Sequence, residues 1–385
     1  MSAVGAPARR SRRAQAPLML MSAVALLAGL WAGLLRLGWA VPPLGAQVLG
    51  NHGPLMVNGF LGTVISLERA VALGRNLGGR RRYMIVPVLA GLSGLALLLP
   101  LPPFVARGLA TAAALGLVGI FIVIYRLQPG ADHAVLGLAA VLWAIGNVLW
   151  LAGWPVPRVV AWWAGFLVLT IAGERLELAR VLLMARAARG MFLGIVGLFC
   201  AGLVLSLVAP DAGLRLAGLG LVALGAWLLR FDIARITIRR EGLTRFIAAC
   251  LLPGYVWLLI GGSLWMFYGA SFAAGPIYDA LLHTLFLGFV MSMIFGHAPV
   301  IIPAVMGVRI PYRPAFYAHL LLLHVSLILR VAGDLLPNWP ARRWGGMLNE
   351  VAILLFLAVT IMAARTKKPE PVRQPAVVKP TMDEV

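Results

Sequence analysis

Apolar residues form long, nearly uninterrupted blocks along this chain, and polar residues are confined to short segments between the blocks. The blocks at 17–41, 246–269 and 344–364 are typical. Each is long enough to cross a bilayer core, which takes about 20 apolar residues in a helix. Lipid offers the backbone no hydrogen-bond partners, so these segments must be helical. The pattern predicts an all-α membrane protein.

About twelve membrane spans are expected. They lie at residues 17–41, 46–73, 84–102, 104–126, 133–152, 158–183, 190–209, 211–231, 246–269, 276–306, 314–336 and 344–364. Together they form one transmembrane domain over residues 17–364, flanked by a basic tail at 1–16 and a basic, disordered tail at 365–385. The basic start resembles a signal peptide, but the first span is too long for one and is expected to remain as an anchor.

Composition agrees with this class, because 61% of the residues are hydrophobic and 12% are charged. Soluble domains have roughly 45–50% and 25%. The net charge of +20 would also suit nucleic-acid binding, but the positions of the basic residues point to topology instead. If the N-terminus is cytoplasmic, the inside segments receive Arg9, Arg10, Arg12, Arg13, Arg75, Arg80, Arg81, Arg82, Arg186, Arg189, Arg235, Arg239, Arg240, Arg245, Arg309, Arg313 and the tail from Arg365 to Lys379.

The outside segments and their edges receive only Arg107, Arg158, Arg215, Arg342 and Arg343. This asymmetry follows the positive-inside rule. We therefore expect a multi-pass protein of a cell membrane, a bacterial inner membrane, with both termini in the cytoplasm and no nucleic-acid partner. Tryptophans near the outer ends of spans are expected to form an interfacial belt: Trp39, Trp150, Trp154, Trp162, Trp163, Trp265, Trp339 and Trp344.

Spans two, six and ten run in the same direction, and two of them share a charged motif. Span two ends inside with Glu68-Arg69, and span six ends inside with Glu174-Arg175. The even spacing of these spans favours three groups of four helices. Interfacial ion pairs explain the motif, and a proton or substrate path is the alternative.

Two histidines are predicted to lie at the same depth. His52 is six residues into span two and His283 is seven residues into span ten, both entered from outside, which puts each imidazole about 10 Å below the outer boundary. Histidines in spans often serve only helix–helix hydrogen bonding. However, two imidazoles on two helices at one depth can also coordinate a haem iron from opposite faces. Gly59 would leave room for the flat macrocycle, and Pro54 predicts that His52 lies at a helix start.

Two further histidines lie nearer the inner side. His297 follows His283 by about 21 Å along the helix axis, and His319 of span eleven lies at a similar depth. This geometry allows a second metal site, with a second haem or copper, although simple hydrogen bonding accounts for both residues as well. His133 begins span five and is interpreted as interfacial.

These residues resemble a known family. His52-Gly53-x-x-Met56 in the second of twelve helices is similar to the low-spin haem motif of haem–copper oxidase subunit I. His283 matches the second ligand, which that family takes from helix ten. The resemblance also implies that Arg342 and Arg343, in the loop before span twelve, contact haem propionates. It extends over all twelve spans as topology, but its motifs cover only three short stretches.

The departures from that family narrow the expectation. The second histidine of helix ten is absent, because Leu281 and Leu285 flank His283, and spans six and seven contain no histidine. A terminal oxidase with a binuclear centre is therefore not expected, and whether the protein is an enzyme stays open. What remains resembles NnrS, a twelve-helix family of membrane haem proteins linked to bacterial nitric-oxide metabolism and described as containing haem and copper.

The leading hypothesis is thus a b-type haem protein with His52 and His283 as ligands. It would bind or sense a diatomic gas such as nitric oxide, or pass electrons from a respiratory donor. The alternative is a secondary transporter of a small molecule or ion, which broken helices such as that around Pro299 and Pro303 would suit. A third hypothesis is an assembly factor for a respiratory complex.

The topology is directly testable with reporter fusions. A reporter placed after Val385, or inserted near Arg81 or Arg240, should report the cytoplasm, because these segments carry the excess of positive charge. A reporter near Pro210 or Pro337 should report the outside. An external C-terminus would contradict the number of spans.

Overall fold

The structure is a computed structural model that describes residues 6–43, 45, 48–77, 80–179 and 185–365. The α-helices in these residues are α1 Ala6–Arg36, α2 His52–Pro54, α3 Thr63–Leu77, α4 Arg80–Tyr83, α5 Ile85–Ala96, α6 Pro103–Leu127, α7 Ala131–Leu151, α8 Val156–Ala179, α9 Arg186–Leu205, α10 Pro210–Phe231, α11 Ala234–Thr237, α12 Gly242–Tyr268, α13 Gly275–His283, α14 Ser292–Met306, α15 Phe316–Leu335 and α16 Trp339–Arg365. A 3₁₀ turn precedes α2 at Leu49–Asn51.

The expected fold class is confirmed: the chain is an all-α, multi-pass membrane protein. Eleven helical segments of the described chain are long and apolar enough to cross a membrane. The third expected span, 84–102, is shorter than predicted, because its α-helix ends at Ala96 and the chain then turns as far as Pro100. At the N-terminal side, α1 begins at Ala6 and therefore includes part of the tail expected at 1–16. The tail predicted at 365–385 lies outside the described residues beyond Arg365.

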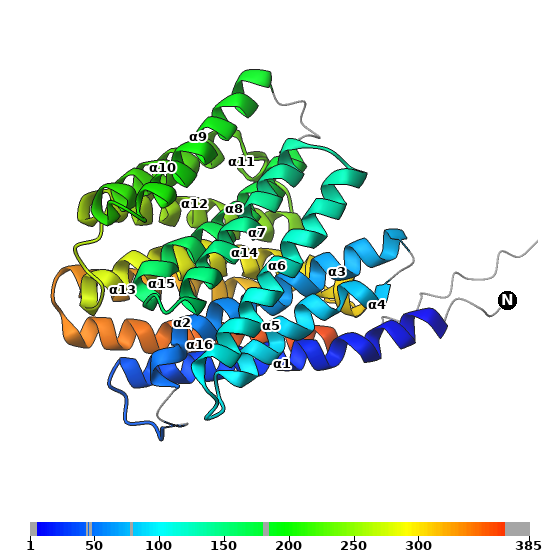
Figure 1. Cartoon of the computed structure of the whole chain (residues 1–385), viewed down its shortest axis with the longest axis horizontal. Coiled ribbons are helices and arrows are strands. Elements are labelled where there is room, and N and C mark those ends of the chain that lie inside the picture. Colours follow the sequence, from blue (N-terminus) through cyan, green and yellow to red (C-terminus); the bar gives the residue numbers. More distant parts are fainter. Residues whose placement is uncertain (1–5, 44, 46–47, 78–79, 180–184, 366–385) are drawn as a thin grey trace, which may run out of the picture.

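The helices pack into one bundle, some near the long axis of the molecule, as α1 and α16, and others oblique to it, as α6 and α9 (Figure 1). α2 and α13 lie at one end of this bundle, on the left of the view, and α3 and α4 lie toward the other end. According to the predicted topology, the α2/α13 end faces outward. It is called the predicted outer end below, and the opposite end is called the predicted inner end.

Spans two, six and ten form the centre of the bundle. The most hydrophobic windows of Leu49–Gly74, Val156–Leu178 and Gly275–Met306 are 61%, 78% and 67% buried within the protein, against 33–56% for the other candidate spans of the described chain. These are the three spans that the sequence pattern singled out as equivalent. The grouping of all twelve helices into three units of four stays a prediction.

Both central helices with a candidate ligand contain a π-helical segment. In span two the π-helix covers Leu55–Gly62 and is followed by α3. In span ten it covers Thr284–Met291 and is followed by α14. π-helical turns are rare and occur mostly at functional sites. Each of these segments begins within three residues of a histidine, His52 or His283.

Two local expectations from the sequence are wrong. A Cβ atom on Gly59 would lie 2.8 Å from Ala25 Cβ and 2.9 Å from Gly94 Cα. Gly59 therefore permits close packing of span two against α1 and α5, as small residues do between membrane helices, and leaves no room there for a macrocycle.

The tryptophan belt is also only partly formed. Trp150, Trp162, Trp163 and Trp265 are at most 4% exposed and pack inside the bundle. Trp339 and Trp344, at 49% and 55% exposed, are placed as a belt requires.

Candidate functional site

The structure brings His52 and His283 together. Their ring centroids are 6.3 Å apart, with the ring planes inclined by 34°. His52 is the first residue of α2, as Pro54 predicted, and His283 is the last residue of α13. A metal held between two imidazoles at bonds of roughly 2.0–2.1 Å would place the ring centroids about 6.3–6.5 Å apart. The observed separation therefore matches an ion coordinated from opposite sides.

Each imidazole is fixed through one ring nitrogen. His52 Nδ1 lies 2.7 Å from the Gly29 carbonyl oxygen, and His283 Nδ1 lies 2.9 Å from the Asp279 carbonyl oxygen. The carbonyls can only accept, so Nδ1 is the protonated nitrogen of both rings and Nε2 carries the free lone pair. Metal-binding histidines are typically held in this way, with the second nitrogen donating to a carbonyl or carboxylate.

Two glycines of α1, one helical turn apart, lie beside His52 and its neighbours. A Cβ atom on Gly33 would lie 3.4 Å from His52 Cε1 and 2.7 Å from Glu350 Oε1 of α16. One turn earlier, a Cβ atom on Gly29 would lie 2.7 Å from Met56 Sδ. The two glycines thus let His52, Met56 and Glu350 approach α1 closely, and Glu350 faces the candidate site although it is only 8% exposed.

A network of buried charges continues from His283 into α15 and α16. Asp279 Oδ1 lies 3.3 Å from His283 Nδ1. The same carboxylate accepts two hydrogen bonds from Arg330, at 2.8 and 3.0 Å. Arg342 Nε lies 2.7 Å from Asp334 Oδ1, and its Nη2 lies 3.9 Å from Asp279 Oδ1. Carboxylate, guanidinium and imidazole groups therefore hold each other in place at the predicted outer end.

Arg342 and Arg343 are not in a loop, as the resemblance implied, because α16 begins at Trp339. Arg342 is paired with Asp334, and the Arg343 guanidinium lies 4.1 Å from the centre of the Trp39 ring. Their contact with haem propionates stays a prediction.

Sequence reasoning missed Asp279, Arg330, Asp334 and Glu350. The signal was present: Arg330 and Asp334 are charged residues inside an apolar span, which is uncommon unless they are paired or functional. Asp279 precedes His283 by one helical turn.

The structure does not bring the second pair, His297 and His319, into one site. His297 Nε2 lies 3.4 Å from Arg175 Nη1, and its Nδ1 lies 2.7 Å from the Met293 carbonyl oxygen. Both nitrogens of His297 therefore already have partners. His319 is packed instead against a set of aromatic rings, those of Phe246, Phe295, Phe316 and Phe356. Neither ring nitrogen of His319 has a hydrogen-bond partner among the described residues.

The Glu–Arg motifs of spans two and six form ion pairs between helices. Arg69 pairs with Glu174, and the Arg175 guanidinium lies 3.3 Å from Asp232 Oδ2. With the Arg175–His297 contact, these pairs join spans two, six and ten near the predicted inner end. Because Arg175 and Asp232 have side chains at most 3% exposed, losing either partner would leave a buried charge, at a cost of about 3–5 kcal/mol. Structural ion pairs, the explanation given above for the Glu–Arg motif, account for these contacts.

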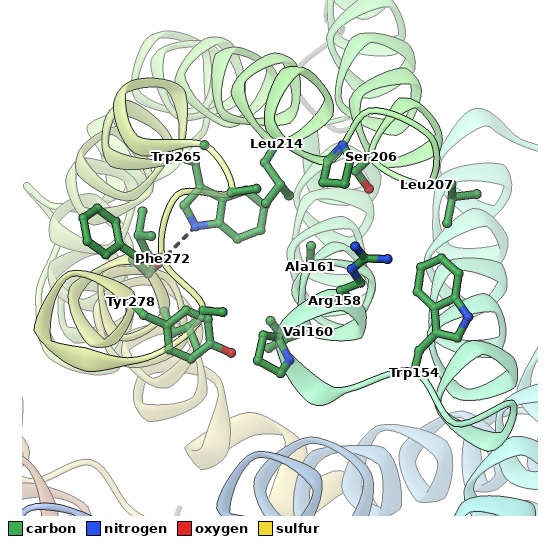
Figure 2. Close-up of a pocket in the computed structure, with 17 residues that line it drawn as sticks. Trp154, Arg158, Val160, Ala161, Ser206, Leu207, Leu214, Trp265, Phe272 and Tyr278 are labelled. Carbon is green, nitrogen blue, oxygen red and sulfur yellow. Dashed lines mark hydrogen bonds between the residues drawn. The ribbon is translucent and has the colours of Figure 1, made fainter.

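A separate pocket of about 310 Å³ lies at the predicted outer end, between α8, α10, α12 and α13. Figure 2 shows Trp154 and Trp265 on opposite sides of it, with Tyr278 on the Trp265 side and Arg158 nearer Trp154. The Trp265 indole nitrogen donates to the Leu281 carbonyl oxygen at 3.2 Å, which ties α12 to α13. The pocket therefore lies beside the helix that ends at His283.

The comparisons with known proteins give a family without a function. No curated protein matches the chain. Residues 15–365, which include all the candidate residues above, match a family described only as a domain of unknown function, DUF8744. The matched region covers most of α1 and every later helix of the described chain. The chain belongs to the DUF8744 family.

Proposed function

We propose that this multi-pass membrane protein binds a b-type haem through His52 and His283, and that it uses the haem to bind a diatomic gas or to pass electrons, as in the resemblance to NnrS. The observation that supports the proposal most is the pair of facing imidazoles, 6.3 Å apart between ring centroids. A b-type haem is proposed because the sequence has only two cysteines and no CxxCH motif.

The fit of these residues to haem rests on the donor set. Two imidazoles whose Nδ1 atoms are held by carbonyl oxygens can offer Nε2 to an iron, and axial ligands are a main lever on haem chemistry. When bound, the haem would supply a one-electron couple at the iron. The protein would hold His52 through the Gly29 carbonyl and His283 through Asp279.

Electron transfer and gas binding make different demands on the two haem ligands. Electron transfer requires both histidines to stay bound. Gas binding requires one ligand to leave, and His52 is the candidate because it lies at a helix start, between a 3₁₀ turn and a π-helix. His283 is held more firmly, since Asp279 is itself fixed by Arg330 through two hydrogen bonds.

Arg342 and Arg343 are proposed to set the potential of the haem from the predicted outer end. Arg342 is already partnered by Asp334, so its proposed role is to contribute positive charge near the haem, with a propionate as a further partner. Guanidinium groups bind carboxylates bidentately, which suits that role.

A secondary transporter is the second candidate. It is favoured by the π-helical segments in the two central spans and by the aromatic pocket beside Arg158. Transporters often bind substrate at interrupted helices. A purified protein without haem would favour the transporter.

The haem ligands can be tested by substitution. His283→Ala should abolish haem retention, because it removes the better-fixed ligand. His133→Ala is the control and should leave haem retention intact, because His133 lies on α7 and is distant in sequence from both candidate ligands. Haem content is measured per chain by the pyridine haemochrome absorbance of purified protein. A His283→Ala variant with the spectrum of the wild type would reject this site.

The charge at the predicted outer end should tune the midpoint potential. Replacing both Arg342 and Arg343 by Gln removes positive charge. Because this loss favours the oxidised iron over the reduced iron, the midpoint potential should fall. At roughly 10 Å and an effective dielectric constant of about 20, each charge contributes about 1–2 kcal/mol, equivalent to tens of millivolts. Redox titration measures the shift, with Arg107→Gln on α6 as the control. Full haem content with an unchanged potential would restrict both arginines to packing and topology.

A further inference from the structure

Three potential metal ligands meet where α7 begins and α8 ends, at the predicted inner end and apart from the His52–His283 pair. They are Asp132 and His133 of α7 and Glu177 of α8. One ligand atom from each lies within 4.8 Å of those of the other two. Asp132 and His133 are buried, at 0% and 8% exposed, and Glu177 is exposed. Solvent can therefore reach the cluster from the Glu177 side.

Helix packing explains why these side chains meet. A Cβ atom on Gly173 would lie 2.8 Å from Leu136 Cγ and 3.4 Å from the Asp132 carbonyl oxygen. The glycine thus lets α8 approach the first turns of α7. Glu177 follows Gly173 by about one helical turn, which brings its carboxylate to the level of Asp132 and His133.

The orientation of His133 is the second observation that points to a ligand. Its Nδ1 lies 2.7 Å from the Gln128 carbonyl oxygen, so Nδ1–H donates and Nε2 keeps the lone pair. Within the described part of the chain, no hydrogen bond to Nε2 is seen. A buried imidazole whose second nitrogen is fixed by a carbonyl is the arrangement of a metal-binding histidine.

We infer that Asp132, His133 and Glu177 form a binding site for a divalent transition-metal ion such as Zn²⁺. One imidazole and two carboxylates suit zinc, with water in the fourth position. Mg²⁺ and Ca²⁺ prefer oxygen ligands alone, and copper(I) prefers sulfur. In a tetrahedral zinc site the donors are about 3.4 Å apart, so small side-chain rotations would close the observed cluster around an ion.

The three residues do not carry equal weight in a test. Asp132 lies in the first turn of α7, where the helix dipole favours a carboxylate, so it also has a structural role. His133 and Glu177 are therefore the residues to change. The bound ion would cross-link α7 to α8 at the predicted inner end, and this inference does not depend on the proposed haem.

The test uses the full chain, without an affinity tag, purified in detergent and treated with EDTA. Zn²⁺ is then titrated against a chromophoric chelator, and the metal retained after desalting is measured by mass spectrometry. We expect one Zn²⁺ per chain for the wild type. His133→Ala and Glu177→Gln should each weaken binding by at least about tenfold, as loss of ligands or their supports does in metal sites. Glu241→Gln, an exposed carboxylate ahead of α12, is the matched control and should bind as the wild type does.

Two further measurements keep the result interpretable. Size-exclusion profiles and thermal unfolding without metal show whether each variant is folded, and Zn²⁺ should raise the unfolding temperature of the wild type and of Glu241→Gln only. A wild-type chain that retains no Zn²⁺ overturns the inference. The inference is also overturned if His133→Ala and Glu177→Gln both bind Zn²⁺ as tightly as the wild type does, because the metal would then lie elsewhere. Either outcome leaves the haem proposal unaffected, since that proposal is measured by haem content.

Discussion

A bilayer core offers the chain no hydrogen-bond partners, so each polar group within the spans must find its partner inside the protein. Most of the arrangement seen here follows from that constraint. Irregular backbone is tolerated at membrane depth only where protein surrounds it, and both π-helical segments lie in spans two and ten, two of the three most buried spans. Ion pairs between helices satisfy buried charges of the spans for the same reason, as Arg175 with Asp232 and Arg330 with Asp279.

The same constraint distinguishes the histidines by the hydrogen-bond partners of their ring nitrogens. His297 and His324 have protein partners at both ring nitrogens, so they are satisfied without a ligand. The printed contacts of His52 and His283 hold each ring through Nδ1, by the Gly29 carbonyl oxygen and by Asp279, and the two ring centroids lie 6.3 Å apart. His319, by contrast, lies among phenylalanine rings with both nitrogens unpartnered in the described part of the chain.

Much of the arrangement could be predicted from the sequence because membrane helices leave strong signals. The lengths of the hydrophobic segments predicted the spans. The depth counted along two helices placed His52 and His283 at the same level of the membrane. The failures concern interactions between helices, which a single helix pattern does not contain. Gly59 was taken as space for a ligand, but its neighbour is Gly94 of another helix. Asp279 and Arg330 belong to one ion pair, yet they lie on different spans and become visible as partners only when the spans are packed. The third span was expected to be longer because apolar residues continue past Ala96, although Pro100, Pro102 and Pro103 already indicate a turn.

The central claim is that the facing imidazoles of His52 and His283 hold a haem. Its most direct test is the reduced-minus-oxidised absorption spectrum of the wild-type protein, purified from cells supplied with haem. The account predicts the sharp bands of a six-coordinate, low-spin b-type haem, and little change on adding carbon monoxide while both histidines remain bound. A folded, pure protein with no haem absorbance would contradict the account.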